Sequence, residues 1–285
     1  MSQTRVLTRV ALLAAVAAAA LAAAGCAASA KVPLTPPLGA VKRDLAYTKA
    51  MLYANHRPWQ SLDAGCQVTI ANPQIPLPDR QVTVGNGRLR FEKPNMVRIV
   101  LPDTNDPQVR IVGDGKAYYA AMPLLTSEYS GKYTDPVSPQ PGRISFLPAD
   151  VADALEPTNL FVGRGLTLTQ GEQISNLYSV EPLTGPEPGI RTTSVVFVDR
   201  REEKLRGIEK YNDDGSIRCR VQYLNIQSVL LKGGQSVQVP LVFDISYPEE
   251  QTTIRIQLQG VALNVKMPEG AFDVSAASSR RPAPR

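Results

Sequence analysis

Polar and apolar residues alternate along most of the chain from residue 62 to residue 265, and this period of two is typical of strands with one buried face. The segment 237–247 shows it most clearly, with an apolar residue at nearly every second position. Turn residues separate about eleven such segments. The predicted strands are 62–70, 82–91, 97–101, 109–111, 116–122, 174–180, 193–198, 205–211, 217–226, 237–247 and 253–265.

Glycine residues mark two irregularities in this pattern. The apolar positions change parity across residues 85–87, and they change again at Gly260. A β-bulge is the natural interpretation of both, with a turn as the alternative at 85–87. The pairs Asp114-Gly115 and Asp214-Gly215 are hairpin signals.

Two segments have a helical pattern instead. Apolar residues in 38–55 recur at spacings of three, four and seven, which predicts an amphipathic helix that ends at Arg57-Pro58. Residues 146–155, with Pro148 near the start and Pro157 after the end, predict a short helix. Strands and helices do not alternate regularly, so we expect one mainly β domain over 38–273, an antiparallel meander whose inner face the two helices cover.

The formal net charge of +5 comes from 31 Lys and Arg against 26 Asp and Glu. Residues 1–25 hold two of the basic residues, residues 278–285 hold three, and neither segment holds an acid. The remaining 26 basic and 26 acidic residues make 26–277 formally neutral. A nucleic-acid groove places its basic excess inside the folded domain, so the sequence argues against a nucleic-acid partner.

The chain is also poor in the residues that catalysis and metal binding use. It has one histidine, His56, which we expect to be exposed or to cap a helix end, and three cysteines. A single histidine excludes a multi-histidine metal site, and no nucleophile–base pair or carboxylate dyad stands out. We therefore expect neither an enzyme nor a metal site, and no cofactor. Cys66 and Cys219 fall on the apolar faces of their strands; a disulfide is one interpretation, and two buried thiols are the simpler one.

Residues 1–25 read as a signal peptide. Arg5 and Arg9 precede an apolar stretch of Ala, Leu and Val that is too short to span a bilayer as a helix. Small residues then lead into Cys26, which is similar to the lipobox of bacterial lipoproteins. We expect Cys26 to be acylated, with an ordinary secretory signal or an uncleaved anchor as the alternatives. Residues 26–37 would form the lipidated N-terminus and a Pro-rich linker, and 274–285 a disordered tail.

The order of elements and several short motifs resemble the LolA/LolB-like lipoprotein carriers and receptors. The chain has Lys93-Pro94-Asn95 where that family ends a strand with Arg-Pro-Asn, and a later hairpin reads Val-Gly-Asp-Gly-Lys over 112–116, followed by aromatic residues. The end of the domain, with Met267-Pro268 and Phe272, is also similar. The resemblance implies a strongly curved, unclosed antiparallel β-barrel of about eleven strands, with a few helices plugging an apolar concave side.

The same resemblance implies candidate site residues. Lys93 would contact the lid or a headgroup, although lysine lacks the planar fork of the family's arginine. The apolar cavity would be lined by inward-facing residues, for which a packed core is the competing interpretation. These candidates are Leu62, Val68, Phe91, Ile99, Tyr119, Phe243 and Ile245.

These observations lead to two hypotheses. In the first, a lipid-anchored envelope protein on the periplasmic face of the outer membrane binds acyl chains of lipoproteins or lipids. It would help transfer lipoproteins to that membrane, with a periplasmic carrier protein as a further candidate partner. In the second, the same fold is an interaction or sensory module that recognises a partner protein without carrying lipid.

Overall fold

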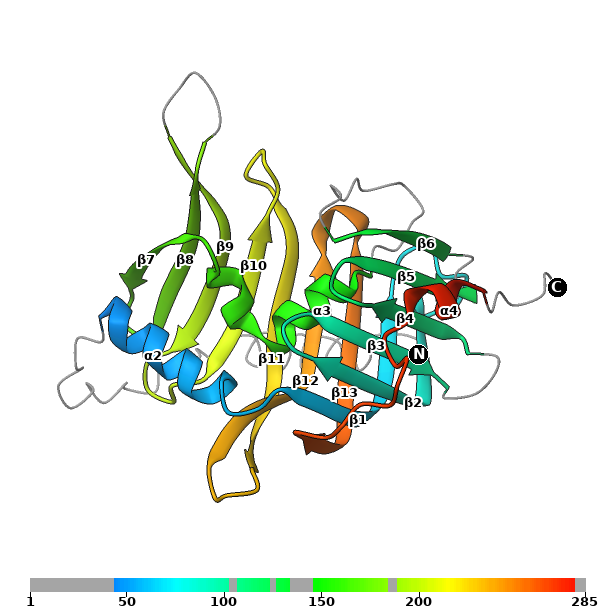
Figure 1. The fold of residues 1–285 in the computed structure, drawn as a ribbon. Coiled ribbons are helices and arrows are strands. Elements are labelled where there is room, and N and C mark those ends of the chain that lie inside the picture. Colours follow the sequence, from blue (N-terminus) through cyan, green and yellow to red (C-terminus); the bar gives the residue numbers. More distant parts are fainter. Residues whose placement is uncertain (1–43, 103–106, 124–126, 134–145, 184–188, 280–285) are drawn as a thin grey trace, which may run out of the picture. The chain divides into compact units, whose positions relative to one another are not determined.

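Thirteen strands form one antiparallel sheet in the computed structural model, which describes residues 44–102, 107–123, 127–133, 146–183 and 189–279 (Figure 1). The sheet order is β6-β5-β4-β3-β2-β1-β13-β12-β11-β10-β9-β8-β7. In chain order the strands are β1 (Ser61–Ala71), β2 (Gln81–Glu92), β3 (Met96–Leu101), β4 (Val109–Gly113), β5 (Ala117–Met122), β6 (Ser127–Lys132), β7 (Gly165–Gln170), β8 (Ile174–Pro182), β9 (Ile190–Asp199), β10 (Leu205–Tyr211), β11 (Ile217–Leu230), β12 (Ser236–Tyr247) and β13 (Thr252–Leu263).

The helices of the described residues are few and short. They are α2 (Leu45–His56), α3 (Pro148–Leu155), α4 (Val274–Ser279) and the 3-10 turns η2 (Pro157–Phe161) and η3 (Pro248–Glu250). Asp44 caps α2 by accepting a hydrogen bond from the backbone N–H of Tyr47 at 2.8 Å. Among the described residues, none of these helices has the length and apolar composition needed to span a membrane. The leader, Cys26, the linker and residues 280–285 lie outside the described residues.

The sheet is strongly curved and unclosed, as the resemblance implies. Within the described residues, β6 and β7 end the strand order and do not pair with each other. The helix α3 contacts β3, β4 and also β12, although four strand positions separate β3 from β12 in the sheet. Likewise, α2 contacts both β7 and β12. One helix can touch strands so far apart only if the sheet bends around it, so α2 and α3 lie on the concave side (Figure 1).

Both predicted bulges are confirmed. Cys66 pairs with Gly87 and Val68 pairs with Val84, so two residues of β2 face Gln67 alone. On the other side of β1, Gly65 pairs with Gln259 and Asp63 with Ala262, so Gly260 and its neighbour form the second bulge. Gly260 has a φ of 59°, a left-handed conformation that glycine adopts without steric cost.

Two predictions differ from the structure at the edges of the fold. The sequence prediction misses β6 and β7, the two edge strands, because each is short and has few buried residues that would reveal its alternation. The expected disordered tail is wrong for α4, which buries Ala277 against the outer face of β4 and β5. The prediction failed because one small buried side chain on a six-residue helix leaves no apolar repeat.

Candidate functional site

Six of the seven residues expected to line the concave side lie there. Leu62, Val68, Phe91, Ile99, Phe243 and Ile245 are all fully buried in the main hydrophobic cluster. Leu62 pairs with Phe91 across β1 and β2, and Phe243 pairs with Ile256 across β12 and β13. The inward parity of these positions is therefore confirmed, and each packs as a core residue.

Tyr119 is the exception, and its expected place in the cavity is wrong. It is buried in a second cluster with Val112, Ala121 and Ala277, on the face that α4 covers. Tyr118, its neighbour on β5, packs against the concave cluster instead. Successive side chains of a strand point to opposite faces, and the sequence of one strand does not indicate which of its faces becomes concave.

The helix α3 fills the middle of the concave side. Six of its eight residues are buried, and Val151 and Leu155 belong to the main cluster. It also carries Asp150, a fully buried acid in an otherwise apolar turn. A buried carboxylate is costly unless opposite charges and hydrogen bonds compensate it.

Asp150 meets this requirement through side chains of β10, β11 and β12. Its Oδ1 accepts hydrogen bonds from Lys210 Nζ at 2.8 Å and Arg218 Nη2 at 2.5 Å. Its Oδ2 accepts from Arg218 Nη1 at 3.1 Å and Tyr247 OH at 3.0 Å. Lys210 also pairs with Asp153, one turn further along α3. Burial alone would raise the pKa of Asp150, but Arg218 and Lys210 outweigh it and hold that pKa well below its usual value.

The other end of α3 is attached through Lys93, the predicted lid residue. Its Nζ forms an ion pair with Glu156, the residue that follows α3, and donates a hydrogen bond to the carbonyl of His56, the last residue of α2. The ammonium also lies 4.2 Å from the ring centroid of Trp59, which is fully buried. Lys93 therefore joins both helical covers to the turn between β2 and β3.

His56 is buried at this junction, so of the two places expected for it, an exposed one is wrong, and it lies at the end of a helix. It ends α2, but only 2% of its surface is accessible, and its ring centroid lies 6.3 Å from that of Trp59. Its Nδ1 lies 3.8 Å from Glu156 Oε2. Burial lowers the pKa of His56 to about 4, with Glu156 opposing the shift and Lys93 adding to it. The imidazole is therefore neutral at pH 7.

The helix α2 is the less firmly attached cover. Only Thr48, Leu52 and His56 are buried on it. An exposed hydrogen bond of 2.7 Å from Tyr47 OH to Glu203 Oε1 ties its first turn to the segment between β9 and β10. A cleft of about 10 Å³ lies beneath it. Its lining is largely apolar and comprises Met51, Leu52, Asn55, His56, Glu203, Leu205, Ile226, Gln238 and Pro240.

The remaining candidate residues have structural explanations. Cys66 and Cys219 are free, buried thiols, which agrees with the simpler of the two interpretations. Burial raises the pKa of Cys66 to about 12, so it is a poor nucleophile. Asp114 Oδ1 accepts hydrogen bonds from the backbone N–H groups of Lys116 and Ala117, as expected of a hairpin turn.

The sequence prediction did not include the ion pairs that hold α3. Two signals were available: Asp150 interrupts the apolar pattern of a short helix, and Lys210 occupies the same parity as the buried Ile208. A charge at an inward-facing position indicates a buried pair. Its partner cannot be read from the sequence, because Asp150 and Arg218 are 68 residues apart.

The fold and its plugged concave face define a class, the unclosed β-barrels with helical covers. Solved structures that superpose on this chain have a similar fold. A domain assigned to outer membrane lipoprotein sorting in Vibrio parahaemolyticus superposes with a TM-score of 0.52 at 12% identity, over 82% of this chain and 97% of that one. A DUF1329 family protein from Desulfovibrio piger gives a TM-score of 0.50 at 10% identity, over 81% and 98%.

A LolA superfamily protein from Nitrosomonas europaea is also similar, with a TM-score of 0.48 at 16% identity, over 79% of this chain and 96% of that one. No protein-family model matches the sequence, and no curated protein matches it. The resemblance to LolA/LolB-like proteins is thus confirmed as a resemblance of fold.

Proposed function

We propose that this chain is a non-enzymatic, lipid-anchored envelope protein that binds acyl chains of lipoproteins or lipids on the concave face of its sheet and passes lipoproteins to the outer membrane. One observation carries the proposal: α2, which buries only three residues, covers a largely apolar cleft. The fold similarity to a lipoprotein-sorting domain supports the same ligand class. Binding an acyl chain requires only that its apolar surface be removed from water, and no catalytic group takes part.

Displacing α2 is energetically within reach of an acyl chain. The only large apolar side chain that α2 buries fully is Leu52, and Leu45, Met51 and Tyr53 pack partly buried against the same core. Re-exposing one fully buried side chain of this size costs about 1.5–3 kcal/mol, and the three partly buried side chains add to that cost. Each methylene taken from water contributes about 0.8 kcal/mol, so about ten of them contribute about 8 kcal/mol. A bound chain can therefore replace α2 as the cover of Leu205, Ile226 and Pro240.

The helix α3 would stay in place during this exchange. Both of its ends are held by buried ion pairs, at Asp150 and at Glu156, and separating such pairs without replacement costs about 3–5 kcal/mol each. The weaker cover opens first, so we assign the entry of the ligand to α2 and the floor of the site to α3.

A fluorescent fatty acid titrated into the purified full chain tests the binding site. Ile226→Glu places a carboxylate in the cleft beneath α2, so it should abolish binding because the charge must be desolvated against hydrocarbon. Ile190→Glu is the matched control, since Ile190 is already 72% exposed at the start of β9. Absence of binding by the unaltered chain, or equal binding by both variants, would overturn the proposed site.

A second pair of variants tests α2 as the moving cover. Tyr47→Phe removes the hydrogen bond to Glu203 that ties down α2, and it should speed fatty-acid association. Tyr211→Phe is the control, because Tyr211 OH also donates to a glutamate at 2.7 Å, but to Glu209 on its own strand. Equal association rates in the two variants would contradict the assignment of α2.

The lipid anchor is proposed from the sequence of the leader. Cys26 follows small residues at the end of a short apolar stretch, and several acyl chains on it would hold the protein stably on a membrane. Labelled palmitate should be incorporated into the unaltered chain and not into Cys26→Ser. Density-gradient separation of the envelope would then show whether the acylated chain resides in the outer membrane.

The interaction-module hypothesis is favoured by one observation, the complete burial of the six inward-facing candidates. A core this full leaves less room for ligand than an open barrel. Photo-crosslinking in the native membrane separates the two functions. A carrier should trap many different lipoproteins, whereas a module should trap one constant partner.

A further inference from the structure

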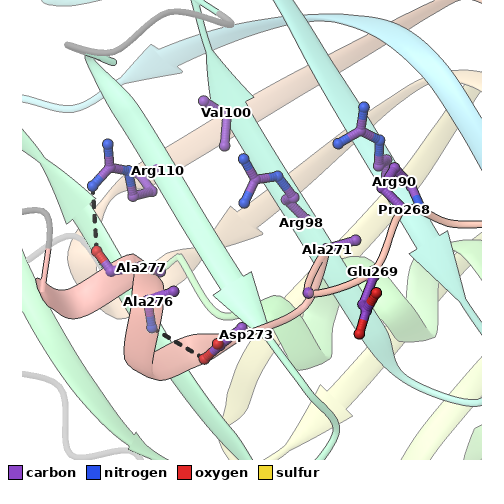
Figure 2. A pocket seen from close by; sticks show the side chains of 11 residues that line it. Arg90, Arg98, Val100, Arg110, Pro268, Glu269, Ala271, Asp273, Ala276 and Ala277 are labelled. Carbon is purple, nitrogen blue, oxygen red and sulfur yellow. Dashed lines mark hydrogen bonds between the residues drawn. The ribbon is translucent and has the colours of Figure 1, made fainter.

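Polar pockets of about 240 Å³ lie on both faces of the sheet. The pocket on the convex face contains a row of arginines from three adjacent strands, Arg90 on β2, Arg98 on β3 and Arg110 on β4 (Figure 2). Arg110 Nη1 donates a hydrogen bond of 3.2 Å to the carbonyl of Ala277 on α4 (Figure 2). This arginine attaches α4 to the sheet, so the row has a structural role.

The pocket on the concave side has a different character. It lies where β8, β9, β10 and β11 meet Arg164, which follows η2. Its volume is below the roughly 300 Å³ at which sites for drug-sized ligands begin, so it can hold one small ring. Ligand pockets are usually lined by apolar and aromatic side chains, whereas each of the ten residues that line this pocket carries a polar or charged group. The lining therefore suits a polar ligand and not an acyl chain.

Two of the cations that line this pocket pair with acids of its rim. Arg164 Nε lies 2.9 Å from Glu181 Oε1. Arg191 Nη2 lies 3.4 Å from Glu181 Oε2, and its Nη1 donates a hydrogen bond of 2.5 Å to Asp213 Oδ1. All four side chains line the pocket, so each charge of the rim has an opposite charge beside it.

The other two cations, Lys210 and Arg218, form the inner wall and pair with acids of α3. Both bind Asp150, and Lys210 also binds Asp153. The four cations of the pocket thus meet four carboxylates. A charged ligand would lose its own hydration here and find no unpaired opposite charge in return, so the pocket favours a neutral ligand.

The paired side chains retain unused hydrogen-bonding groups. Arginine has five N–H donors, and the two Nη groups of Arg164 donate no hydrogen bond within the described part of the chain. Asp213 Oδ2 and the hydroxyl of Thr192 also form no hydrogen bond with any described residue. The pocket therefore presents donors and acceptors side by side without a net charge.

Two buried hydroxyl groups extend this polar region across the concave face. Ser194 pairs with Lys210 across β9 and β10, and with Ser179 across β8 and β9. Both serines are fully buried, and neither Oγ has a hydrogen-bond partner among the described residues. Burying an unpaired hydroxyl costs free energy. Apolar residues at these two positions would avoid that cost, so packing does not explain the polarity of this region.

We propose that this pocket binds a neutral, hydroxyl-rich ring, the glycosyl unit of a sugar. Each hydroxyl group both donates and accepts hydrogen bonds. Neighbouring hydroxyls of one ring can therefore accept from Arg164 and Thr192 and donate to Asp213 without breaking an ion pair. The sugar is either free or the headgroup of a glycolipid, and both sources share this chemistry. The site is separate from the cleft beneath α2 and does not depend on acyl-chain binding there.

Calorimetric titration of the purified full chain with soluble glycosides tests the proposal. The probes are methyl glucoside, methyl galactoside and methyl mannoside, with inorganic phosphate and ethanolamine as an anion and a cation for comparison. Saturable binding of at least one glycoside, and of neither ion, is the expected result. Glucosylglycerol and galactosylglycerol are glycolipid headgroups without their chains. Tighter binding of either than of the methyl glycosides assigns the site to glycolipids, whereas equal or weaker binding assigns it to free sugars.

Arg164→Gln should weaken glycoside binding about tenfold and Thr192→Val about threefold, the effects of losing one charged and one neutral hydrogen-bonding group. Arg206→Gln is the control for the first, because Arg206 on β10 pairs with Asp199 outside this pocket. Thr167→Val is the control for the second, because Thr167 is exposed on β7. A thermal unfolding scan without ligand shows that each variant is folded. Glycoside affinity that is unchanged in both pocket variants, or reduced equally in the controls, would overturn the proposal. The absence of saturable glycoside binding, or equal binding of either ion, would do the same.

Discussion

The buried carboxylate of Asp150 should be the most important single charge for the stability of this fold. It is fully buried and accepts four hydrogen bonds, two of them from Arg218. Asp150→Asn keeps the shape of the side chain but removes its charge and turns an NH₂ group toward donors. Lys210 retains Asp153 as a partner, whereas Arg218 is left in the interior without the carboxylate that compensates it.

Removing one partner from a buried ion pair costs about 3–5 kcal/mol. Urea denaturation followed by circular dichroism measures this loss. With a denaturant slope near the upper end of about 1–3 kcal/mol per molar, the midpoint should fall by roughly 1–2 M. Asp244→Asn is the matched control, since Asp244 also accepts from two nitrogens of an arginine, Nε and Nη2 of Arg255, but that arginine is 47% exposed. That control should cost no more than about 1 kcal/mol.

The pH dependence gives the same prediction a second, independent test. The pKa of Asp150 is lower in the folded chain than its ordinary value of 3.8, so the stabilisation is complete above that value. It is lost as the pH falls below about 4 toward the folded pKa. Asp150→Asn should remove this acid-induced loss. The reasoning is refuted if Asp150→Asn costs no more than Asp244→Asn, or if both chains lose stability equally in acid.

Three further predictions concern the junction of α2 with α3 and the buried thiols. The pKa of His56 falls from 6.5 in the unfolded chain to about 4 in the folded chain, so between these pH values only the unfolded chain binds a proton at His56. The free energy of unfolding should therefore drop by roughly 3 kcal/mol as the pH falls from 6.5 to 4, and denaturation curves of His56→Gln should lack this pH dependence. Lys93→Met and Glu156→Gln should be non-additive by about 1–3 kcal/mol in a double-mutant cycle of unfolding free energies; additive losses would show that their ion pair contributes nothing. Cys66 and Cys219 should stay unreactive toward a thiol reagent until urea unfolds the chain, and rapid modification of the native protein would contradict their burial.

Local sequence determined most of the elements and the side of the sheet that each residue faces. The alternation in β12, the parity changes at residues 85–87 and at Gly260, and the Asp114-Gly115 turn each follow from short-range backbone preferences. Such patterns can be recognised from neighbouring residues alone. The apolar pattern is weakest at β6, β7 and α4, because each edge strand pairs with only one other strand and α4 is held by one small buried side chain.

Tertiary structure alone decided which residues meet. Periodicity assigns Tyr118 and Tyr119 to opposite faces, but only the curvature of the sheet makes one face concave and leaves Tyr119 on the other. The ion pairs of Asp150 and the row formed by Arg90, Arg98 and Arg110 likewise join separate strands and helices. The alternation of apolar and polar residues in a segment indicates which of its residues are buried. The residues that they contact depend on how distant strands bend around the same helix. The covers of the concave face and the arginine pocket on the convex face are therefore properties of the fold.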